Sequence, residues 1–362
     1  MTDSPFLHAR TVAEIDTAAL SHNYLTLSRA CGKTIAVVKA NAYGHTLSLT
    51  VPAFLRAGCD FFAVASTAEA LEVRKLAPFA HILLLGYAPM SEISALSHAR
   101  ITLCAFSLSY AQALSRVAGE CGVSLPVHLK IDVGMCRLGF PPESVEEILR
   151  VLKLPHLNVC GIFTHFPEAD TDKAATKCAL SRFNALRSRL PVSLFAHAAA
   201  SAAACALPEA RLDAIRAGIA LYGYPPVTTA LDLRPAMQLR APVVQLRRIA
   251  AGTSVGYGGD FVCQRDSLIG TLPLGYADGF CRALAGHRLT VLCAEQTFTA
   301  PVVGRVCMDY LTLDLTDVPA KEGQTVCVFG DFAAAARLAG TIPYELLTAI
   351  SVRVPRAEKG RI

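Results

Sequence analysis

The stretch IAVVKANAYG, residues 35–44, decides how the fold is interpreted. Its first four residues are apolar, and the run ends directly at Lys39, which precedes the segment Asn-Ala-Tyr-Gly. A strand that crossover helices bury on both faces is typically a continuous apolar run without polar alternation. The stretch therefore predicts a buried parallel strand over 35–38 with a lysine at its carboxyl end.

The same kind of apolar run recurs through the first two thirds of the chain. Segments with helical periodicity, such as 67–76 and 141–152, separate the runs. Eight strand–helix units in about 200 residues predict the α/β class and a (β/α)8 TIM barrel, with a doubly wound open sheet as the alternative. The predicted strands are 35–38, 61–65, 82–85, 101–105, 126–131, 159–163, 193–197 and 213–216.

The pattern changes after about residue 226, where Pro and Gly punctuate short runs rich in Val, Leu and Thr. Such runs are typical of a β-rich domain of the sandwich or barrel type. We therefore expect a barrel domain at 1–230 and a β-rich C-terminal domain at 231–362. The segment TVAEID, residues 11–16, is expected to form a lone strand before the barrel.

Composition excludes several classes of protein. The net charge of +5 is mild and no dense Lys/Arg run occurs, so a nucleic-acid partner is not expected. The 13 cysteines are scattered without a C-x-x-C pair, which argues against zinc and against a disulfide framework. The N-terminus lacks a signal-peptide pattern and no run reaches the length of a membrane span. We expect a cytoplasmic protein without a metal or a membrane partner.

Ionisable residues gather where the predicted strands end. Functional groups of a TIM barrel lie at the carboxyl ends of its strands, and several ionisable groups on one rim are typical of an active site. The residues in these positions are Lys39, Lys130, Arg137, His165, His197 and Arg216.

Each of these residues also has an ordinary structural explanation. A lysine after a strand is usually solvated, a histidine in this position is usually a hydrogen-bonded core residue, and Arg216 suits a carboxylate partner. Yet a lysine amine at a barrel mouth can form a Schiff base with an aldehyde cofactor and then act as a base. Residues 216–219 follow the eighth strand, where barrels often bind phosphate through backbone N–H groups. The hydroxyls of Tyr43 and Ser201 suit the same anion or a backbone hydrogen bond.

Taken together, the chain resembles the alanine racemase family. The resemblance covers nearly the whole chain in order, which makes it more specific than any single motif. The segments that carry it are AVVKANAYGH (36–45), HLKIDVGMCRLGF (128–140), GIFTHF (161–166), FAHAAASAA (195–203), AIRAGIALYGYPP (214–226), SVGYGG (254–259), PLGYADGF (273–280), VVGRVCMDY (302–310) and YELL (344–347) with RVPR (353–356).

The resemblance implies a pyridoxal 5'-phosphate enzyme with a barrel followed by a β-rich domain. It implies that Lys39 carries the cofactor as a Schiff base and that Arg137 contacts the cofactor's phenolic oxygen. Lys130 matches a position that is often carbamylated in the family, where the new carboxylate orients that arginine. The residues implied to hold the phosphate are Tyr43, Ser201, Gly218 and Ile219, and His197 is expected among the cofactor contacts.

Racemisation needs one proton removed from one face of a carbon and another returned on the opposite face. The resemblance assigns one face to Lys39 and the other to Tyr257 in SVGYGG. A free tyrosine has a pKa of about 10, so it needs help to act near neutrality. The resemblance places His165 in a hydrogen bond with Tyr257 and Arg216 close behind. Without the resemblance, Tyr257 would be interpreted as an aromatic residue in a glycine turn.

Arg216 matches the family residue that faces the pyridine nitrogen. Because arginine stays protonated, it cannot give that nitrogen a proton, and the ring is then a weaker electron sink. This property is expected to suppress transamination.

The resemblance also implies a head-to-tail homodimer with composite sites. Tyr257 would reach the cofactor of the partner subunit, and a monomer would lack its second base. Met308, beside Cys307 and Asp309, would offer a backbone N–H to the substrate carboxylate. Tyr276 would line the entrance.

Three positions depart from the family pattern. Ala200 stands where Asn is usual, Cys136 where Asn or Gly is usual, and Val352 where some members have a phosphate-contacting Tyr. The losses of polar groups favour relaxed selectivity for the side chain, because one methylene is worth only about 1–3 kcal/mol of discrimination. Alanine is the expected substrate, and serine or a broader range of small amino acids is the alternative.

Other classes of function remain as alternatives. A non-catalytic pyridoxal-phosphate-binding barrel predicts no second domain with a base. A decarboxylase of similar architecture would favour an acidic partner on the ring nitrogen, and a phosphate-binding isomerase would not bind pyridoxal. The expected biological role is D-alanine supply for peptidoglycan or alanine catabolism.

Overall fold

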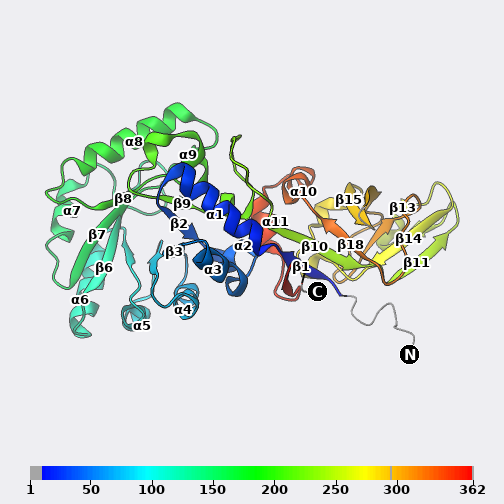
Figure 1. Ribbon diagram of the computed structural model, residues 1–362, viewed down its shortest axis with the longest axis horizontal. Coiled ribbons are helices and arrows are strands. Elements are labelled where there is room, and N and C mark those ends of the chain that lie inside the picture. The colour runs from blue at the N-terminus through cyan, green and yellow to red at the C-terminus, as the bar shows by residue number, and fades with distance from the viewer. Residues whose placement is uncertain (1–9, 294–295, 361–362) are drawn as a thin grey trace. The chain divides into compact units, whose positions relative to one another are not determined.

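The computed structural model describes residues 10–293 and 296–360 (Figure 1). By its internal contacts the chain divides into two units. The barrel unit comprises residues 18–42 and 47–234, and the β unit comprises the other described residues. Residues 43–46, which follow the first barrel strand, therefore pack with the β unit.

Eight parallel strands form the barrel unit. They make two four-stranded sheets, in the orders β4-β3-β2-β9 and β5-β6-β7-β8. The parallel bridges Leu83–Thr102 and Ala200–Arg216 join these sheets at both ends. The strands are β2 (Thr34–Val37), β3 (Phe61–Val64), β4 (His81–Leu84), β5 (Leu103–Ala105), β6 (Leu125–Lys130), β7 (Leu157–Phe163), β8 (Phe195–His197) and β9 (Ile215–Ala217).

The ring of strands is closed, which confirms the predicted TIM barrel and makes the open sheet wrong. All eight predicted strands are present within about two residues of their expected positions, as far as sequence patterns locate boundaries. Strands β2 and β3 are buried along their whole length, because neighbouring strands and helices cover both faces.

Helices lie between the strands and surround them (Figure 1). Side-chain caps begin three of them: Ser66 accepts from the Glu69 N–H, Ser107 from the Tyr110 N–H, and Asp172 from two N–H groups. The helices of this unit are α1 (Thr17–Cys31), α3 (Leu47–Arg56), α4 (Thr67–Leu76), α5 (Ile93–His98), α6 (Leu108–Glu120), α7 (Val145–Val151), α8 (Lys173–Arg187) and α9 (Ser201–Ala206), with short 3-10 turns η1 (Met90–Glu92), η2 (Pro208–Ala210) and η3 (Ile219–Tyr222).

The β unit contains a six-stranded sheet in the order β16-β15-β18-β10-β1-β19, a three-stranded sheet β11-β14-β17 and the hairpin β12-β13. This arrangement confirms the predicted β-rich C-terminal part. Its strands are β1 (Val12–Ile15), β10 (Met237–Pro242), β11 (Gln245–Ile249), β12 (Ser254–Val255), β13 (Phe261–Val262), β14 (Ser267–Leu272), β15 (Arg288–Cys293), β16 (Gln296–Pro301), β17 (Leu311–Asp314), β18 (Thr325–Phe329) and β19 (Arg356–Glu358). Its helices are α10 (Phe332–Ala339) and α11 (Pro343–Ala349), with turns η4 (Tyr257–Gly259), η5 (Tyr276–Asp278) and η6 (Arg282–Leu284).

The strand expected at 11–16 is present, but the expectation that it stands alone is wrong. β1 pairs antiparallel with β10 and parallel with β19, and its four residues are buried. A strand with both edges hydrogen-bonded leaves no unpaired backbone groups, which explains why this N-terminal segment joins the later sheet.

No helix among residues 10–293 and 296–360 is long and apolar enough to cross a membrane.

Candidate active site

The barrel unit brings the ionisable rim residues into one cluster. His165 feels the positive charges of Arg216, Lys130, Arg137 and Lys39. Burial and these cations lower the pKa of His165 to about 3, so the imidazole is neutral near pH 7. The predicted convergence at the carboxyl ends of the strands is therefore present in the structure.

Lys39 begins an unusual left-handed turn, α2 (Lys39–Tyr43). Four consecutive residues that are not glycine have positive φ: Ala40 at 52°, Asn41 at 50°, Ala42 at 57° and Tyr43 at 51°. Each costs about 1–2 kcal/mol relative to the right-handed conformation, so other interactions must hold the turn.

Two side chains in the barrel unit hold this turn. Glu69 Oε1 accepts the Ala40 N–H at 2.6 Å, while its Oε2 accepts the N–H groups of Ala65 and Ser66 at 3.0 and 3.2 Å. The Asn41 side chain accepts the Leu47 N–H at 2.9 Å. The residue directly after Lys39 is thus anchored to the start of α4.

The Lys39 amine carries no carboxylate ion pair among the described residues. Its side chain reaches solvent, but partial desolvation of the ammonium and the nearby Arg137 guanidinium lower its pKa, although Glu69 opposes them. A lowered pKa increases the fraction of neutral amine, which is the form that acts as a nucleophile or base.

Lys130 lies inside the barrel at the end of β6. Its side chain is buried, and its ammonium lies 4.8 Å from the centre of the Phe163 ring. Burial lowers the pKa of Lys130 to about 8, although the nearby Cys104 raises it in part. The positive charges of Arg216 and Arg137 lower it further. A buried lysine in such surroundings is readily deprotonated and suits chemical modification.

The loop that carries Arg137 is organised by Asp132. Its carboxylate accepts the N–H groups of Gly134, Cys136 and Arg137 at 2.9, 3.1 and 3.0 Å. Although partial desolvation opposes it, these donors lower the pKa of Asp132. Cys136 has a positive φ of 54°, which explains physically why Gly or Asn suits this position.

Arg216 is fully buried without a carboxylate partner among the described residues. Its NH1 donates to the His197 carbonyl at 2.6 Å and to the His197 ring at 2.8 Å. Its NH2 donates to the carbonyls of Thr164 and Ala198 at 2.5 and 3.0 Å. Burial lowers the pKa of Arg216 to about 9, which leaves the guanidinium charged at neutral pH.

Ser201, Gly218 and Ile219 meet where α9 and η3 begin. The Ser201 hydroxyl oxygen accepts the N–H groups of Gly218 and Ala220 at 3.0 and 3.3 Å, which leaves its own proton free to donate. Ala200 occupies the N-cap of α9 and offers no side-chain hydrogen bond there, unlike the usual Asn. These groups suit an anion such as a phosphate.

The cluster fits a cofactor that is anionic and carries an aldehyde. Four cations, Lys39, Lys130, Arg137 and Arg216, take part in no ion pair among residues 10–293 and 296–360. Lys130 and Arg216 are buried, and buried cations without an ion pair need an anion nearby. The described residues hold no group of three or more His, Cys, Asp or Glu side chains that could bind a metal ion.

Tyr43 is the one predicted phosphate ligand that packs with the β unit. Its ring is buried and lies 6.1 Å from the ring of Tyr344, and burial raises its pKa above the ordinary tyrosine value. The next residue, Gly44, approaches the backbone so closely that a Cβ would lie 2.2 Å from the Leu347 carbonyl oxygen.

Tyr257 lies in an exposed glycine turn of the β unit. Its side chain is 70% exposed, and Gly256, Gly258 and Gly259 have φ values of 82°, 76° and 65° that favour glycine. Arg305 and Asp260 form a 2.5 Å ion pair that packs against Gly258 of this turn. The described residues of its own unit therefore leave the Tyr257 phenol largely open to solvent.

Tyr276 and Met308 are brought together in the same unit. The Tyr276 N–H donates to the Cys307 carbonyl at 3.1 Å, and the Ala277 N–H donates to the Met308 carbonyl at 3.0 Å. Both Tyr276 and Met308 are exposed.

Asp309, which follows Met308, and its partner Arg353 lie on the same surface. Asp309 accepts a 2.7 Å hydrogen bond from Arg353, and the adjacent Val352 is 90% exposed. The structure therefore places the second set of predicted residues on an open surface.

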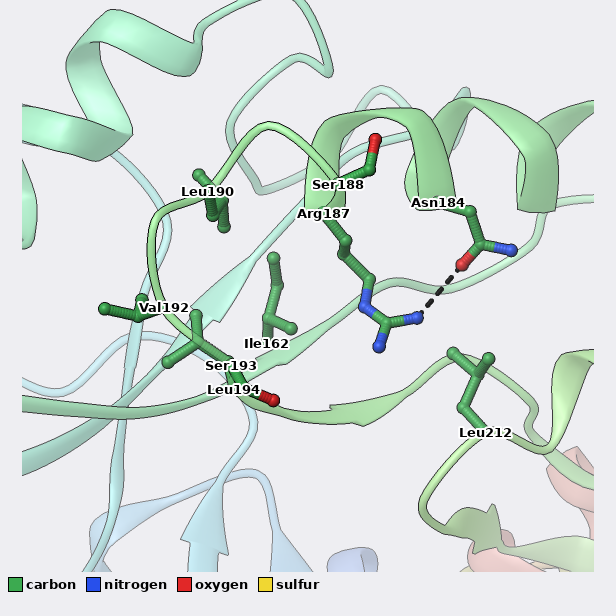
Figure 2. A pocket seen from close by; sticks show the side chains of 9 residues that line it. All are labelled: Ile162, Asn184, Arg187, Ser188, Leu190, Val192, Ser193, Leu194 and Leu212. Carbon is green, nitrogen blue, oxygen red and sulfur yellow. Dashed lines mark hydrogen bonds between the residues drawn. The ribbon is translucent and has the colours of Figure 1, made fainter.

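A separate cavity of about 430 Å³ lies outside this cluster, between α8 and the strands β7 and β8 (Figure 2). Ile162, Leu194 and Leu212 supply apolar walls, and Arg187 donates to Asn184 at 3.0 Å on its edge. None of the predicted site residues lines it.

Sequence reasoning missed two residues of the cluster, Glu69 and His128. The capping pattern Ser66-x-x-Glu69 was visible, but its reach to Ala40 depends on a fold contact. His128 lies two residues before Lys130 on β6, and the period of two along a strand indicates that both side chains share the barrel-facing side.

Comparisons with known proteins agree over the whole chain. Sequence models described as alanine racemase N-terminal domain and C-terminal domain match residues 15–226 and 236–358. Alanine racemase 1 of Clostridium acetobutylicum is 39% identical, with 97% of this chain and 96% of that protein covered.

Two solved structures extend the likeness to the fold. The alanine racemase of Clostridium difficile 630 superposes with a TM-score of 0.90 at 34% identity, covering 98% of this chain and 97% of the other. The alanine racemase of Bartonella henselae with covalently bound pyridoxal phosphate has a TM-score of 0.88 at 29% identity, covering 97% and 99%.

Proposed function

The chain belongs to the alanine racemase family, and from that premise we propose that it interconverts L- and D-alanine with pyridoxal 5'-phosphate as cofactor. Residues 1–230 supply the cofactor-binding barrel and residues 231–362 supply the second catalytic base. The cluster of unpaired cations around Lys39, together with the family match over both units, is the observation that carries this proposal.

The barrel unit supplies the cofactor contacts. Lys39 binds the cofactor through its amine, and Ser201, Gly218 and Ile219 hold the phosphate together with Tyr43. Arg137 contacts the phenolic oxygen. When bound, the cofactor withdraws electrons from the carbon beside the amino nitrogen, which acidifies the hydrogen on that carbon.

Lys39 and Tyr257 then hold or move the proton on opposite faces of that carbon. The lowered pKa of Lys39 suits an amine that takes a proton and gives it back near neutral pH. Neutral His165 can hydrogen-bond to the Tyr257 phenol, with Arg216 behind it.

Arg216 keeps its proton throughout. The three backbone carbonyls that accept from it stabilise the charged guanidinium, so the arginine orients the cofactor ring without protonating it. This arrangement disfavours the by-product route in which the proton arrives at the wrong carbon.

Lys130 suits carbamylation. Its pKa of about 8 leaves part of the amine neutral, and a neutral amine adds to carbon dioxide to give a carbamate and one proton. The resulting carboxylate would pair with Arg137 and remove one of the like charges around Arg216.

Exposure of Tyr257, Tyr276 and Met308 supports a homodimer with composite sites. In this proposal the three residues act in the partner's barrel, where Met308 offers its backbone N–H to the substrate carboxylate and Tyr276 lines the entrance. Such an exchange of surfaces between two copies closes with twofold symmetry.

The side-chain pocket is proposed to accept serine as a second substrate, since Ala200 and Val352 lack the polar groups usual in the family. We place the protein in the cytoplasm, where D-alanine is needed for peptidoglycan or alanine is catabolised. The thirteen free thiols among the described residues suit a reducing compartment.

A chiral assay of the purified protein tests the proposal. With added cofactor, L-alanine should yield D-alanine until the two are equal, and L-serine should react more slowly. The protein should show the visible absorption of lysine-bound cofactor, and Lys39→Ala should lose it. Visible absorption without any D-amino acid would instead identify a cofactor-binding protein that is not a racemase.

A further inference from the structure

A second histidine lies behind Arg216 in the barrel interior. Nδ1 of His128 and Nε2 of His197 are 2.9 Å apart, and both side chains are buried. Because His197 also contacts Arg216, the three residues form one continuous hydrogen-bonded chain, the His128–His197–Arg216 chain.

The direction of each hydrogen bond in this chain follows from the guanidinium. Arginine has only donors, so Nδ1 of His197 must accept from Arg216. A neutral imidazole that accepts at Nδ1 carries its proton on Nε2, and that proton is donated to Nδ1 of His128. His128 therefore carries its own proton on Nε2.

Both histidines are neutral in this arrangement. Burial and the Arg216 charge lower the pKa of His128 to about 4 and that of His197 well below the ordinary value. A proton on Nδ1 of His197 would point at the guanidinium, so protonation and the observed contact exclude each other.

The barrel is locally adapted to admit the His128 ring. The pairing of β6 with β7 shifts register between Val127 and His128, so that His128 lies opposite Gly161. A Cβ on Gly161 would lie 2.5 Å from three atoms of the His128 ring. Phe61 and Phe195 surround the ring with centroid distances of 6.4 and 6.2 Å.

The chain completes the hydrogen bonding of Arg216. The four terminal N–H groups of the guanidinium are taken by three carbonyls and the His197 ring. Of the five N–H groups of Arg216, only the Nε–H finds no hydrogen-bond acceptor among the described residues. A neutral ring as the fourth acceptor fixes the guanidinium without cancelling its charge.

We propose that His128 is a positioning residue for Arg216: by accepting the Nε2–H of His197, it keeps the Nδ1 lone pair of His197 turned toward the guanidinium. The inference rests on the proposed function only for its effect on racemisation. The proton positions themselves are a property of the folded chain.

Neutron diffraction of the full-length holoenzyme in deuterated solvent tests the proton positions directly. The inference predicts one deuteron on Nε2 of each histidine and none on Nδ1. A deuteron on Nδ1 of His197, or two deuterons on His128, would overturn it.

Matched variants test the consequence for Arg216. In His128→Asn the Oδ1 atom can occupy the place of Nδ1 and accept the same proton, whereas His128→Leu removes the acceptor. We expect kcat to fall about tenfold in His128→Leu with KM little changed, and about threefold or less in His128→Asn, because one buried hydrogen bond is lost only in the former.

A second pair of variants changes residues on β7, the strand next to the His128 ring. Gly161→Ala should displace the ring and reproduce the kcat loss of His128→Leu, while Asn158→Ala, at an exposed position of the same strand, should keep the parent rate. Equal kcat in all four variants would refute the positioning role. Absence of racemisation in the parent enzyme would refute the proposed function, and the neutron experiment would still decide the inference.

Discussion

The barrel rim and the Tyr257 turn differ in how far their proposed site residues are buried and hydrogen-bonded. At the rim, Arg216 is buried and every terminal N–H has an acceptor, and Lys39 is followed by a strained turn that Glu69 holds. In the β unit, Tyr257 is 70% exposed, in a glycine turn beside the Asp260–Arg305 ion pair.

The difference teaches that a single chain buries and hydrogen-bonds Arg216 in the barrel but leaves Tyr257, one of the two proposed proton-transfer groups, exposed. The Tyr257 phenol stays in contact with water, whereas a base in an active site works in a desolvated place. Under the proposed mechanism, a second surface must therefore cover Tyr257.

Removal of the exposed phenol should give the largest effect. Tyr257→Phe should lower kcat for racemisation by about 10²–10⁴-fold, since one of two proton-transfer groups is lost. Exchange of the α-hydrogen with deuterated water should persist from the enantiomer that faces Lys39 and fail from the other. Tyr310→Phe, another exposed tyrosine of the β unit, is the matched control and should retain activity.

Full activity of Tyr257→Phe in both directions would refute the two-base assignment. It would also remove the functional reason for the contrast between the two regions.

Reversing the charge at Arg216, the hydrogen-bonded arginine of the rim, should change the ratio of the products. Arg216→Glu places an acid opposite the ring nitrogen, and we expect transamination per turnover to rise about tenfold or more because a protonated ring is the stronger electron sink. Pyruvate formed per D-alanine measures this ratio. An unchanged product ratio would contradict the role assigned to the guanidinium.

The Glu69 anchor of the Lys39 turn should have a smaller effect. Glu69→Ala and Ser66→Ala each remove part of the cap of α4 and should each lower the free energy of unfolding by about 1 kcal/mol. Only Glu69→Ala also frees the Ala40 N–H, so it alone should slow racemisation, by about tenfold. Equal rates in the two variants would show that the turn holds Lys39 without Glu69.

The barrel could be predicted because each strand is encoded locally as an apolar run of the right length. The closed barrel brings the carboxyl ends of its strands to one rim. The sequence could therefore predict that four ionisable residues lie near one another there: Lys39, Lys130, His165 and Arg216. The pairing of β1 with β10 and β19 escaped prediction, since it depends on partners more than 200 residues away.

Two features of the rim depend on tertiary context and not on pattern. The left-handed turn at residues 40–43 contains no glycine, so no propensity rule indicates it. The role of His128 requires the register shift opposite Gly161, which only the folded sheet reveals.

Acid should destabilise the barrel rim, because two of its histidines are held neutral. The pKa values of His165 and His128 fall from 6.5 to about 3 and about 4, so below pH 6.5 the unfolded chain binds protons that the folded chain does not. The stabilisation is then fully present above pH 6.5 and is lost as the pH falls toward 4 for His128 and toward 3 for His165.

Urea unfolding of the cofactor-free chain across this pH range measures the decline. His165→Asn should reduce the slope by about 1.4 kcal/mol per pH unit, the contribution of one proton. An unchanged slope would mean that His165 is not held neutral by the rim.

Mixed dimers test most directly whether the two halves of the site come from different chains. Lys39→Ala and Tyr257→Phe should each be inactive alone, but a heterodimer of the two contains one site with both bases. Random exchange of subunits should therefore restore about a quarter of the parent activity, because about half of the dimers are mixed and each has one working site. If mixing restores no activity although heterodimers form, Tyr257 does not act across the dimer and the account is wrong.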